Sequence, residues 1–241
     1  MTASAWLRYD VVWPLVSSPR PRRVLEIGPG IAGFGARVAR ICDTYVGVES
    51  SAASREVAAA RLAAARGSGA SVVATLADVP EGAFDLVCAF EVLEHIEDDR
   101  AALADWVGRA TAGGRVVLSV PAFSRRFGPG DEAVGHFRRY DPVRLRELAE
   151  EVGLRDVETT LYGFPAGYAL EAARDLLGRR ALRNAPGSGS KAERSASSGR
   201  WYQPTARVGR LLEHATAPAR VVQRRFPQRG TGLVVIGRLP S

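Results

Sequence analysis

The stretch V-L-E-I-G-P-G-I-A-G-F-G, residues 24–35, decides the fold. Its apolar run predicts a buried strand at 23–27, and a glycine-rich turn then leads into a helical pattern that reaches about residue 41. Gly28 and Gly30 allow a sharp bend and let a ligand lie against the backbone amides, because glycine has no Cβ. A strand that passes through such a turn into a helix N-terminus is typical of nucleotide-binding folds.

Two acidic residues make this turn more specific than its glycines alone. Glu26 comes two residues before Gly28, and Glu49 ends the next predicted strand. A carboxylate at the end of that second strand can accept hydrogen bonds from the hydroxyls of a ribose. The alternative for Glu49 is a solvated acid at the end of a strand.

Strands and helices alternate along the rest of the chain. The expected strands are 23–27, 44–49, 71–75, 83–90, 115–120, 156–162 and 232–237, and the expected helices are 4–16, 33–41, 50–66, 98–111, 141–153, 166–182 and 206–215. The pair Gly113-Gly114 is expected to end the helix before it, and 122–140 to form a long loop. This alternation predicts a parallel sheet with helices on both faces.

The charge of the chain is segregated. Residues 163–230 carry 13 Lys and Arg against 4 Asp and Glu, whereas the remainder carries 20 against 22. We therefore expect a core domain made of 1–162 and 231–241, and a basic helical insertion at 163–230 that builds an acceptor pocket or a lid. Within the insertion, the low-complexity tract 184–200 is poor in apolar residues and is expected to be flexible.

Composition excludes several classes of protein. No stretch approaches the roughly 18 apolar residues that span a bilayer, and no signal-peptide pattern is seen, so a cytoplasmic protein is expected. Cys42 and Cys88 lie in apolar patterns and are expected to be buried thiols in a reducing compartment. With no Cys-x-x-Cys and no paired histidine spacing, no metal site is expected.

The segments found so far resemble, in order and spacing, class I S-adenosylmethionine (SAM)-dependent methyltransferases. The resemblance covers roughly 20–160 and the final strand. The matching motifs are VLEIGPG at 24–30, GVE at 47–49, FDLV at 84–87, EVLEHI at 91–96 and GGRVVLSVP at 113–121. The motif GHFRRYD at 135–141 resembles a bacterial subgroup that methylates small molecules.

The resemblance implies a Rossmann-like, seven-stranded, mostly parallel sheet, with its last strand antiparallel beside the fifth. It also implies SAM as cofactor and S-adenosylhomocysteine (SAH) as product. The residues it places at the cofactor are Glu26, Gly28, Pro29, Gly30, Glu49, Ser50, Leu76, Ala77 and Glu91. Many relatives have an acid just after the third strand for the adenine amino group; here Asp78 comes a few residues late, so backbone groups of Leu76 and Ala77 are expected there instead.

Two candidate residues for the methyl acceptor, His95 and His136, lie at predicted strand ends. His136 is expected either as a general base that contacts the acceptor or as a residue that organises the loop. His95 and Tyr140 are further catalytic candidates, with packing as the alternative for both. Arg139 could hold an anionic group of the substrate. Tyr168 and Trp201 suit a hydrophobic ring or lipid-like acceptor, or a small satellite core.

The sequence therefore predicts a SAM-dependent methyltransferase that acts on the O or N of a small molecule, in bacterial specialised metabolism. The acceptor is expected to be aromatic, lipid-like or anionic. No Asn/Asp-Pro-Pro-Tyr/Phe or Pro-Cys follows the strand at 83–90, so DNA is not expected as a partner. Alternatives are C-methylation, non-methyl SAM chemistry, or a non-catalytic protein that binds an anionic surface or nucleic acid. A homodimer is compatible with the sequence, which does not fix the oligomeric state.

Overall fold

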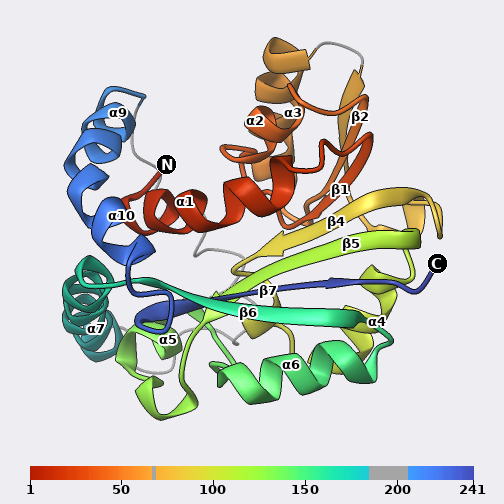
Figure 1. Ribbon diagram of the computed structural model, residues 1–241. Coiled ribbons are helices and arrows are strands. Elements are labelled where there is room, and N and C mark those ends of the chain that lie inside the picture. Colours follow the sequence, from red (N-terminus) through yellow and green to blue (C-terminus); the bar gives the residue numbers. More distant parts are fainter. Residues whose placement is uncertain (67–68, 185–205) are drawn as a thin grey trace.

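The computed structural model describes residues 1–66, 69–184 and 206–241, which form one mixed sheet between two layers of helices (Figure 1). The strands are β1 (Arg23–Ile27), β2 (Thr44–Val48), β3 (Ala70–Val73), β4 (Phe84–Phe90), β5 (Ala110–Pro121), β6 (Arg155–Gly163) and β7 (Gly230–Arg238). Their order in the sheet is β3-β2-β1-β4-β5-β7-β6. The first five pair in parallel, and β7 runs antiparallel between β5 and β6. The predicted Rossmann-like fold is confirmed.

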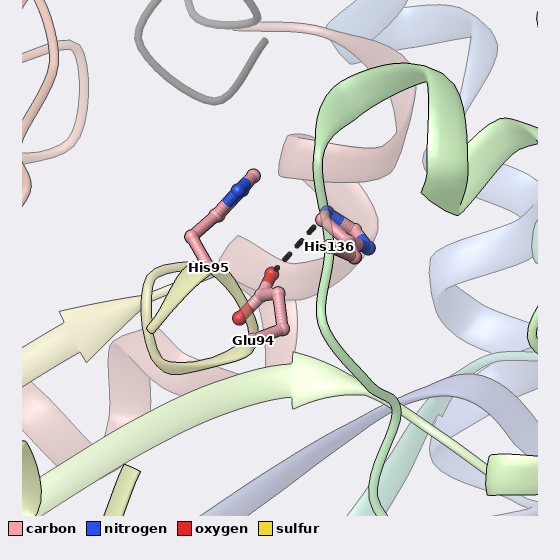
Figure 2. Close-up of side chains that lie close together, drawn as sticks. All are labelled: Glu94, His95 and His136. Carbon is pink, nitrogen blue, oxygen red and sulfur yellow. Dashed lines mark ion pairs between the residues drawn. The ribbon is translucent and has the colours of Figure 1, made fainter. Parts of the chain in front are cut away.

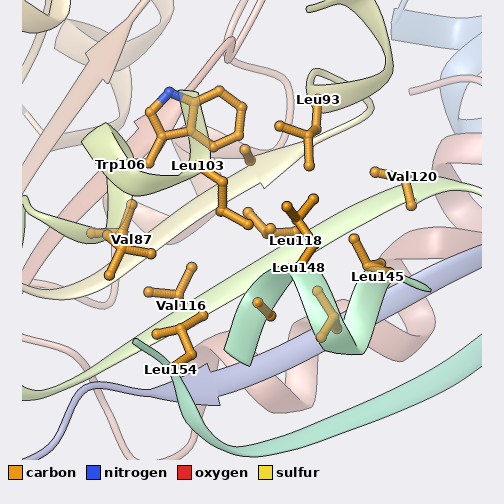
Figure 3. Packing of buried hydrophobic residues seen from close by; sticks show 14 of the residues in the cluster. Val87, Leu93, Leu103, Trp106, Val116, Leu118, Val120, Leu145, Leu148 and Leu154 are labelled. Carbon is orange, nitrogen blue, oxygen red and sulfur yellow. The ribbon is translucent and has the colours of Figure 1, made fainter. Parts of the chain in front are cut away.

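The helices divide between the two faces of this sheet. They are α1 (Ala3–Ser17), α2 (Gly35–Val38), α3 (Ala52–Arg66), α4 (Asp99–Val107), α5 (Pro129–Val134), α6 (Pro142–Glu151), α7 (Ala166–Asn184), α9 (Ala206–Ala215) and α10 (Ala217–Arg224). On one face, Trp106 of α4 and Leu148 of α6 pack in a buried cluster with Val87 and Leu118 (Figure 3). On the other face, α1, α2 and α3 contribute to a second cluster that contains Val24 and the opposite side of the strands.

The strand order positions the site. The chain moves outward from β1 to β2 and β3, and then returns to β4 on the other side of β1. Ligands of open α/β sheets bind at the carboxyl ends of the strands, where the order reverses in this way. The turn after β1, Glu49 after β2 and the segment 91–96 after β4 all lie at that edge.

Several local predictions differ from the structure. The helix expected at 33–41 is reduced to α2, with turns on either side. The helix expected at 98–111 ends at Val107, and Gly113-Gly114 lie inside β5, where Gly113 takes φ +70° at an irregularity of the β4–β5 pairing. The glycines therefore bend a strand and do not end a helix.

The loop expected at 122–140 contains the single turn η4 (Ser124–Arg126) and the helix α5. Both are too short to give a clear helical period in the sequence. Backbone hydrogen bonds between Tyr140 and both Pro121 and Phe123 close this segment into a compact excursion.

Within the described part of the insertion, the helices α7, α9 and α10 lie between β6 and β7 (Figure 1). The sequence predicted α7 and α9 but not α10, which follows α9 after Thr216 alone. Apart from Asn184, the tract 184–200 lies outside the described residues. Among the helices described, none combines the length and the apolar character needed to cross a bilayer.

Gly230 offers a test of the β6–β7 pairing. A Cβ on this residue would lie 2.0 Å from the Tyr162 carbonyl oxygen. We expect Gly230→Ala to lower the free energy of unfolding by about 1–3 kcal/mol, because the added carbon forces the strands apart. Urea denaturation measures the change. Gly108→Ala is the control, since its Cβ would have its nearest contact at 3.5 Å, and equal midpoints for the two variants would contradict the expectation.

Candidate functional site

The two glycines after β1 have different surroundings. Gly28 takes φ +65° and donates its N–H to the Val48 carbonyl at 2.8 Å, and a Cβ there would lie 2.6 Å from Cγ2 of Val92. Gly30 takes φ +56°, and nothing lies within 4 Å of the place where its Cβ would be. The first glycine therefore allows tight packing, and the second presents open backbone at the carboxyl edge of the sheet.

Glu49 links this turn to the start of α3. One carboxylate oxygen accepts the Gly30 N–H and the other accepts the Ser51 N–H, each at 2.9 Å. Each oxygen can accept a further hydrogen bond, because a carboxylate oxygen has two lone pairs. Glu49 thus lies beside the open glycine with the capacity to receive two hydroxyl donors. Ser50, which lies between Glu49 and Ser51 in the sequence, is exposed.

Glu26 is buried beneath the turn. Its carboxylate accepts a hydrogen bond from the Tyr45 hydroxyl at 2.6 Å. Burial raises the pKa of Glu26 to about 7, although the hydrogen bond from Tyr45 and the charge of Arg8 oppose the shift. A cationic group brought near Glu26 would favour its ionised form.

The expected adenine contacts lie on the turn η2 (Leu76–Asp78). Leu76 is half-buried and packs against the core below the sheet edge. Ala77 is exposed, but its N–H donates to the Thr75 hydroxyl at 2.9 Å. The Ala77 amide would therefore have to share its hydrogen to contact a ligand.

Glu91 directly follows β4 and takes φ +59°, a strained value for a residue with a side chain. Its carboxylate accepts hydrogen bonds from the hydroxyls of Ser119 and Tyr162, both at 3.0 Å, and lies 3.6 Å from the guanidinium of Arg8. Glu91 also lines a cavity of about 70 Å³ whose far wall includes Glu171 of α7.

His95 and His136, both predicted as site residues, lie side by side at the carboxyl edge of the sheet. The rings of His95 and His136 lie edge to face with centroids 4.5 Å apart, and Glu94 lies beside them (Figure 2). A backbone hydrogen bond from Phe137 to the Glu94 carbonyl joins their two segments. Burial, together with the neighbouring His136, lowers the pKa of His95 to about 4.

Asp131 on α5 organises the loop that carries His136. Its buried carboxylate lies 2.9 Å from Nδ1 of His136, accepts from Nε of Arg139 at 2.7 Å and from Arg174 at 3.0 Å. These hydrogen bonds lower the pKa of Asp131 against the opposing effect of its burial. Arg139 also donates to Glu171 at 2.8 Å, so the network joins α5 to α7.

The remaining predicted residues lie apart from this network or outside the described chain. Tyr140 is buried and donates to Asp99 at 2.9 Å, and burial with the charge of Asp99 raises its pKa. Tyr168 lies under the guanidinium of Arg126, 4.8 Å from the ring centre. Trp201 lies outside the described residues.

Sequence reasoning missed Arg8, Glu94 and Asp131 as members of this site. Arg8 belongs to a helix that the sequence marked only for packing, and Asp131 lies in the segment expected to be a loop. Glu94 belongs to the recognised motif at 91–96, which could have marked it. For Arg8 and Asp131, the sequence gives no signal beyond the residue type.

A family model described as a methyltransferase domain matches residues 10–159 of the 241-residue chain. The chain belongs to this methyltransferase family. The predicted membership of the SAM-dependent methyltransferases, their fold, and SAM as the cofactor are therefore confirmed.

The methyltransferase is similar to one characterised relative, ajmaline N-methyltransferase from Rauvolfia serpentina. The two are 30% identical over 121 residues, which is 48% of this chain and 41% of the relative. The match thus spans less than half the length of the relative.

Solved structures show the same fold at low identity. The N-methyltransferase NodS from Bradyrhizobium japonicum, solved with SAH, has 18% identity and a TM-score of 0.57, with 99% of this chain and 86% of that chain covered. YcgJ from Bacillus subtilis has 14% identity and a TM-score of 0.61 over 99% of each chain. SpnF, a [4+2]-cyclase, has 16% identity and a TM-score of 0.58, with 97% and 81% covered.

The residues after β1 and β2 fit the cofactor. Gly30 leaves open the space that a Cβ would fill, so a ligand can approach its backbone. Glu49 keeps unused acceptor capacity on both oxygens, as a ribose diol requires. Glu26 is a buried acid near the turn, as the amino group of the methionine part requires.

The pKa of Glu26 gives a pH test in the cofactor-free methyltransferase. The pKa of Glu26 is about 7 in the folded protein and 4.5 ordinarily, so the folded state holds the proton of Glu26 more tightly than the unfolded state does. The stability of the folded state is therefore full below pH 4.5 and falls as the pH rises through about 7. We expect wild type to lose roughly 1–3 kcal/mol between pH 5 and pH 8 relative to Glu26→Gln, which cannot ionise. Urea denaturation at several pH values measures this. The exposed Glu56→Gln should follow wild type, and identical pH profiles for wild type and Glu26→Gln would refute the assignment.

Proposed function

We propose that this methyltransferase transfers a methyl group from SAM to the O or N of a small molecule. The observation that carries the proposal is the position of Glu49, whose carboxylate spans the amides of Gly30 and Ser51 beside the open face of the turn. We assign the ribose to Glu49, the backbone of Gly28–Gly30 to the methionine part, and Glu26 to its amino group.

Methyl transfer requires orientation more than elaborate machinery. SAM supplies an electrophilic methyl group, and holding a nucleophile in line with it can lower the barrier by about 7–11 kcal/mol in ideal cases. Glu91 is well placed to orient an acceptor, because its strained backbone and its bonds to Ser119 and Tyr162 fix the carboxylate. His136 remains our candidate for moving the acceptor's proton, and Tyr140 and His95 for supporting it.

The cavity beside Glu91 is our candidate for the acceptor site. Its volume of about 70 Å³ is well below the roughly 300–1,000 Å³ of typical ligand pockets. The far wall is formed by α7, including Leu170 and Arg174. We propose that the helical insertion shifts to admit the acceptor, and that Tyr168 and Trp201 contribute to the enlarged pocket.

Arg139 is less available to an anionic acceptor than its sequence position suggested. Its guanidinium is buried between Asp131 and Glu171. An anionic substrate would have to displace one of these carboxylates.

The identity of the accepting atom is open to a direct test. Ajmaline N-methyltransferase and NodS are N-methyltransferases by name, which favours nitrogen, whereas SpnF is named a [4+2]-cyclase. We would incubate the protein with isotopically labelled SAM and a panel of amines, phenols and alcohols. Mass spectrometry should show a labelled methyl group on one class of acceptor. Label on carbon, or SAM binding with no transfer to any acceptor of an expanded panel, would contradict the proposal.

Removing Glu49 tests the cofactor site. We expect Glu49→Ala and the size-matched Glu49→Gln to weaken SAH binding by about 10- to 100-fold in calorimetry, because a charge-assisted hydrogen bond contributes about 1.5–3 kcal/mol. Glu56→Ala, an exposed change on α3, should bind as wild type does. Melting temperatures check that each variant is folded. Full SAH affinity in Glu49→Gln would separate Glu49 from the ribose.

A further inference from the structure

Glu94, His95 and His136 converge at the carboxyl edge of the sheet. Each offers one oxygen or nitrogen atom, and these atoms lie within 4.8 Å of one another (Figure 2). Glu94 and His95 come from the turn η3 (Leu93–His95) after β4, and His136 from the segment after α5. Glu91 lies between the end of β4 and η3, so it is close in sequence to Glu94 and His95.

Glu94 is fully buried, and neither of its carboxylate oxygens has a hydrogen-bond partner within the described part of the chain. A buried carboxylate without a partner is costly, whether charged or neutral. The closest cationic candidate, Nε2 of His136, lies 3.9 Å from Oε1, beyond hydrogen-bond range. Among the described residues, therefore, no group satisfies this acid.

Both histidine rings are held so that a nitrogen can face the acid. His136 uses Nδ1 for the 2.9 Å contact with Asp131, which leaves Nε2 on the side of Glu94. The buried Nδ1 of the His95 ring has no hydrogen-bond partner in the described residues. A histidine that ligates a metal usually hydrogen-bonds a carboxylate or backbone carbonyl through its other nitrogen.

We propose that Glu94, His95 and His136 bind a divalent transition-metal ion such as Zn²⁺ or Mn²⁺. Two imidazoles and one carboxylate form a recognised ligand set for these ions. Ligand atoms of a tetrahedral site with bonds of about 2.1 Å lie about 3.4 Å apart. The separations here are up to 4.8 Å, so the three side chains would have to move closer together when an ion binds.

The metal site deepens the proposed function by naming the accepting atom, and this part rests on that function. Three protein ligands leave a coordination position open, and a hydroxyl at a divalent ion loses its proton more readily. An amine nitrogen has one lone pair, which metal binding would occupy, whereas a deprotonated oxygen keeps others. If the ion binds the acceptor, the acceptor is a hydroxyl compound, in contrast to the nitrogen that the names of ajmaline N-methyltransferase and NodS favour. The hydroxyl proton would pass to water and not to His136, because Nε2 of a metal-bound His136 has no free lone pair. The hydroxyl oxygen would form the bond to the methyl carbon, and the electron pair of the broken carbon–sulfur bond would stay on sulfur in SAH.

Metal binding can be measured on the full chain without any acceptor. Tag-free protein, stripped with a chelator, is titrated with Zn²⁺ and separately with Mn²⁺ in a calorimeter, and bound metal is counted by mass spectrometry. We expect one ion per chain. Glu94→Gln and His136→Asn should each weaken binding by at least about 100-fold, whereas His214→Asn removes an exposed histidine of α9 and should leave binding unchanged.

Several outcomes would overturn the metal site. Wild type that binds no ion would refute the site, and so would a Glu94→Gln variant that binds the ion as tightly as wild type and His214→Asn do. If a variant does not fold, the visible spectrum of Co²⁺ added to wild type tests the site. A spectrum that differs from that of the aqueous ion is expected, and an unchanged spectrum would refute the site. SAH calorimetry on the same samples separates the proposals, because SAH binding without metal binding refutes only the metal site.

Discussion

The hydrogen bonds of the buried Asp131 carboxylate are the interactions on which the proposed acceptor side of this methyltransferase depends. The carboxylate receives hydrogen bonds from His136 and Arg139, which lie on the segment after α5, and from Arg174 of α7. Removing one member of a buried ionic network typically costs about 3–5 kcal/mol, because the remaining charges stay buried without partners. Asp131 thus fixes α7, the wall of the small cavity, and the ring of His136 at the same time. The shape of the acceptor side and the direction of its histidine cannot be changed independently.

The proposed cofactor site is built by a different kind of constraint, and its local geometry was the more predictable part. Its elements are a strand, a turn and the next strand, so Glu26, Gly28 and Glu49 lie within 24 residues of one another. Local backbone requirements, such as the positive φ of Gly28, select residue types that are visible in the sequence. The open face of Gly30 and the two amides held by Glu49 are direct consequences of that local pattern.

The acceptor side could not be predicted in the same way, because its contacts join distant segments. Asp131 and Arg174 are 43 positions apart, and their contact depends on how α5 packs against α7. The turn η4 and the helix α5 are too short to give a helical period in the sequence, so 122–140 was expected to be a loop. The excess of basic residues in the insertion was visible in the sequence, but the partners of those residues were not. One of them, Arg174, pairs with the buried Asp131 of the same chain. The local excess of Lys and Arg over Asp and Glu therefore does not by itself imply an anionic ligand.

Glu94 shows how a recognised motif can still conceal a function. The segment EVLEHI identified the family, yet sequence spacing gave no reason to join its histidine to one 41 positions away, and a metal site was not expected. In the structure, a proton on Glu94 would remove the buried charge and supply a single donor. The second Glu94 oxygen and Nδ1 of His95 would not both gain a partner from that one hydrogen. A cation satisfies all these lone pairs together, and its location beside the reacting edge would link that local need to the chemistry of the acceptor.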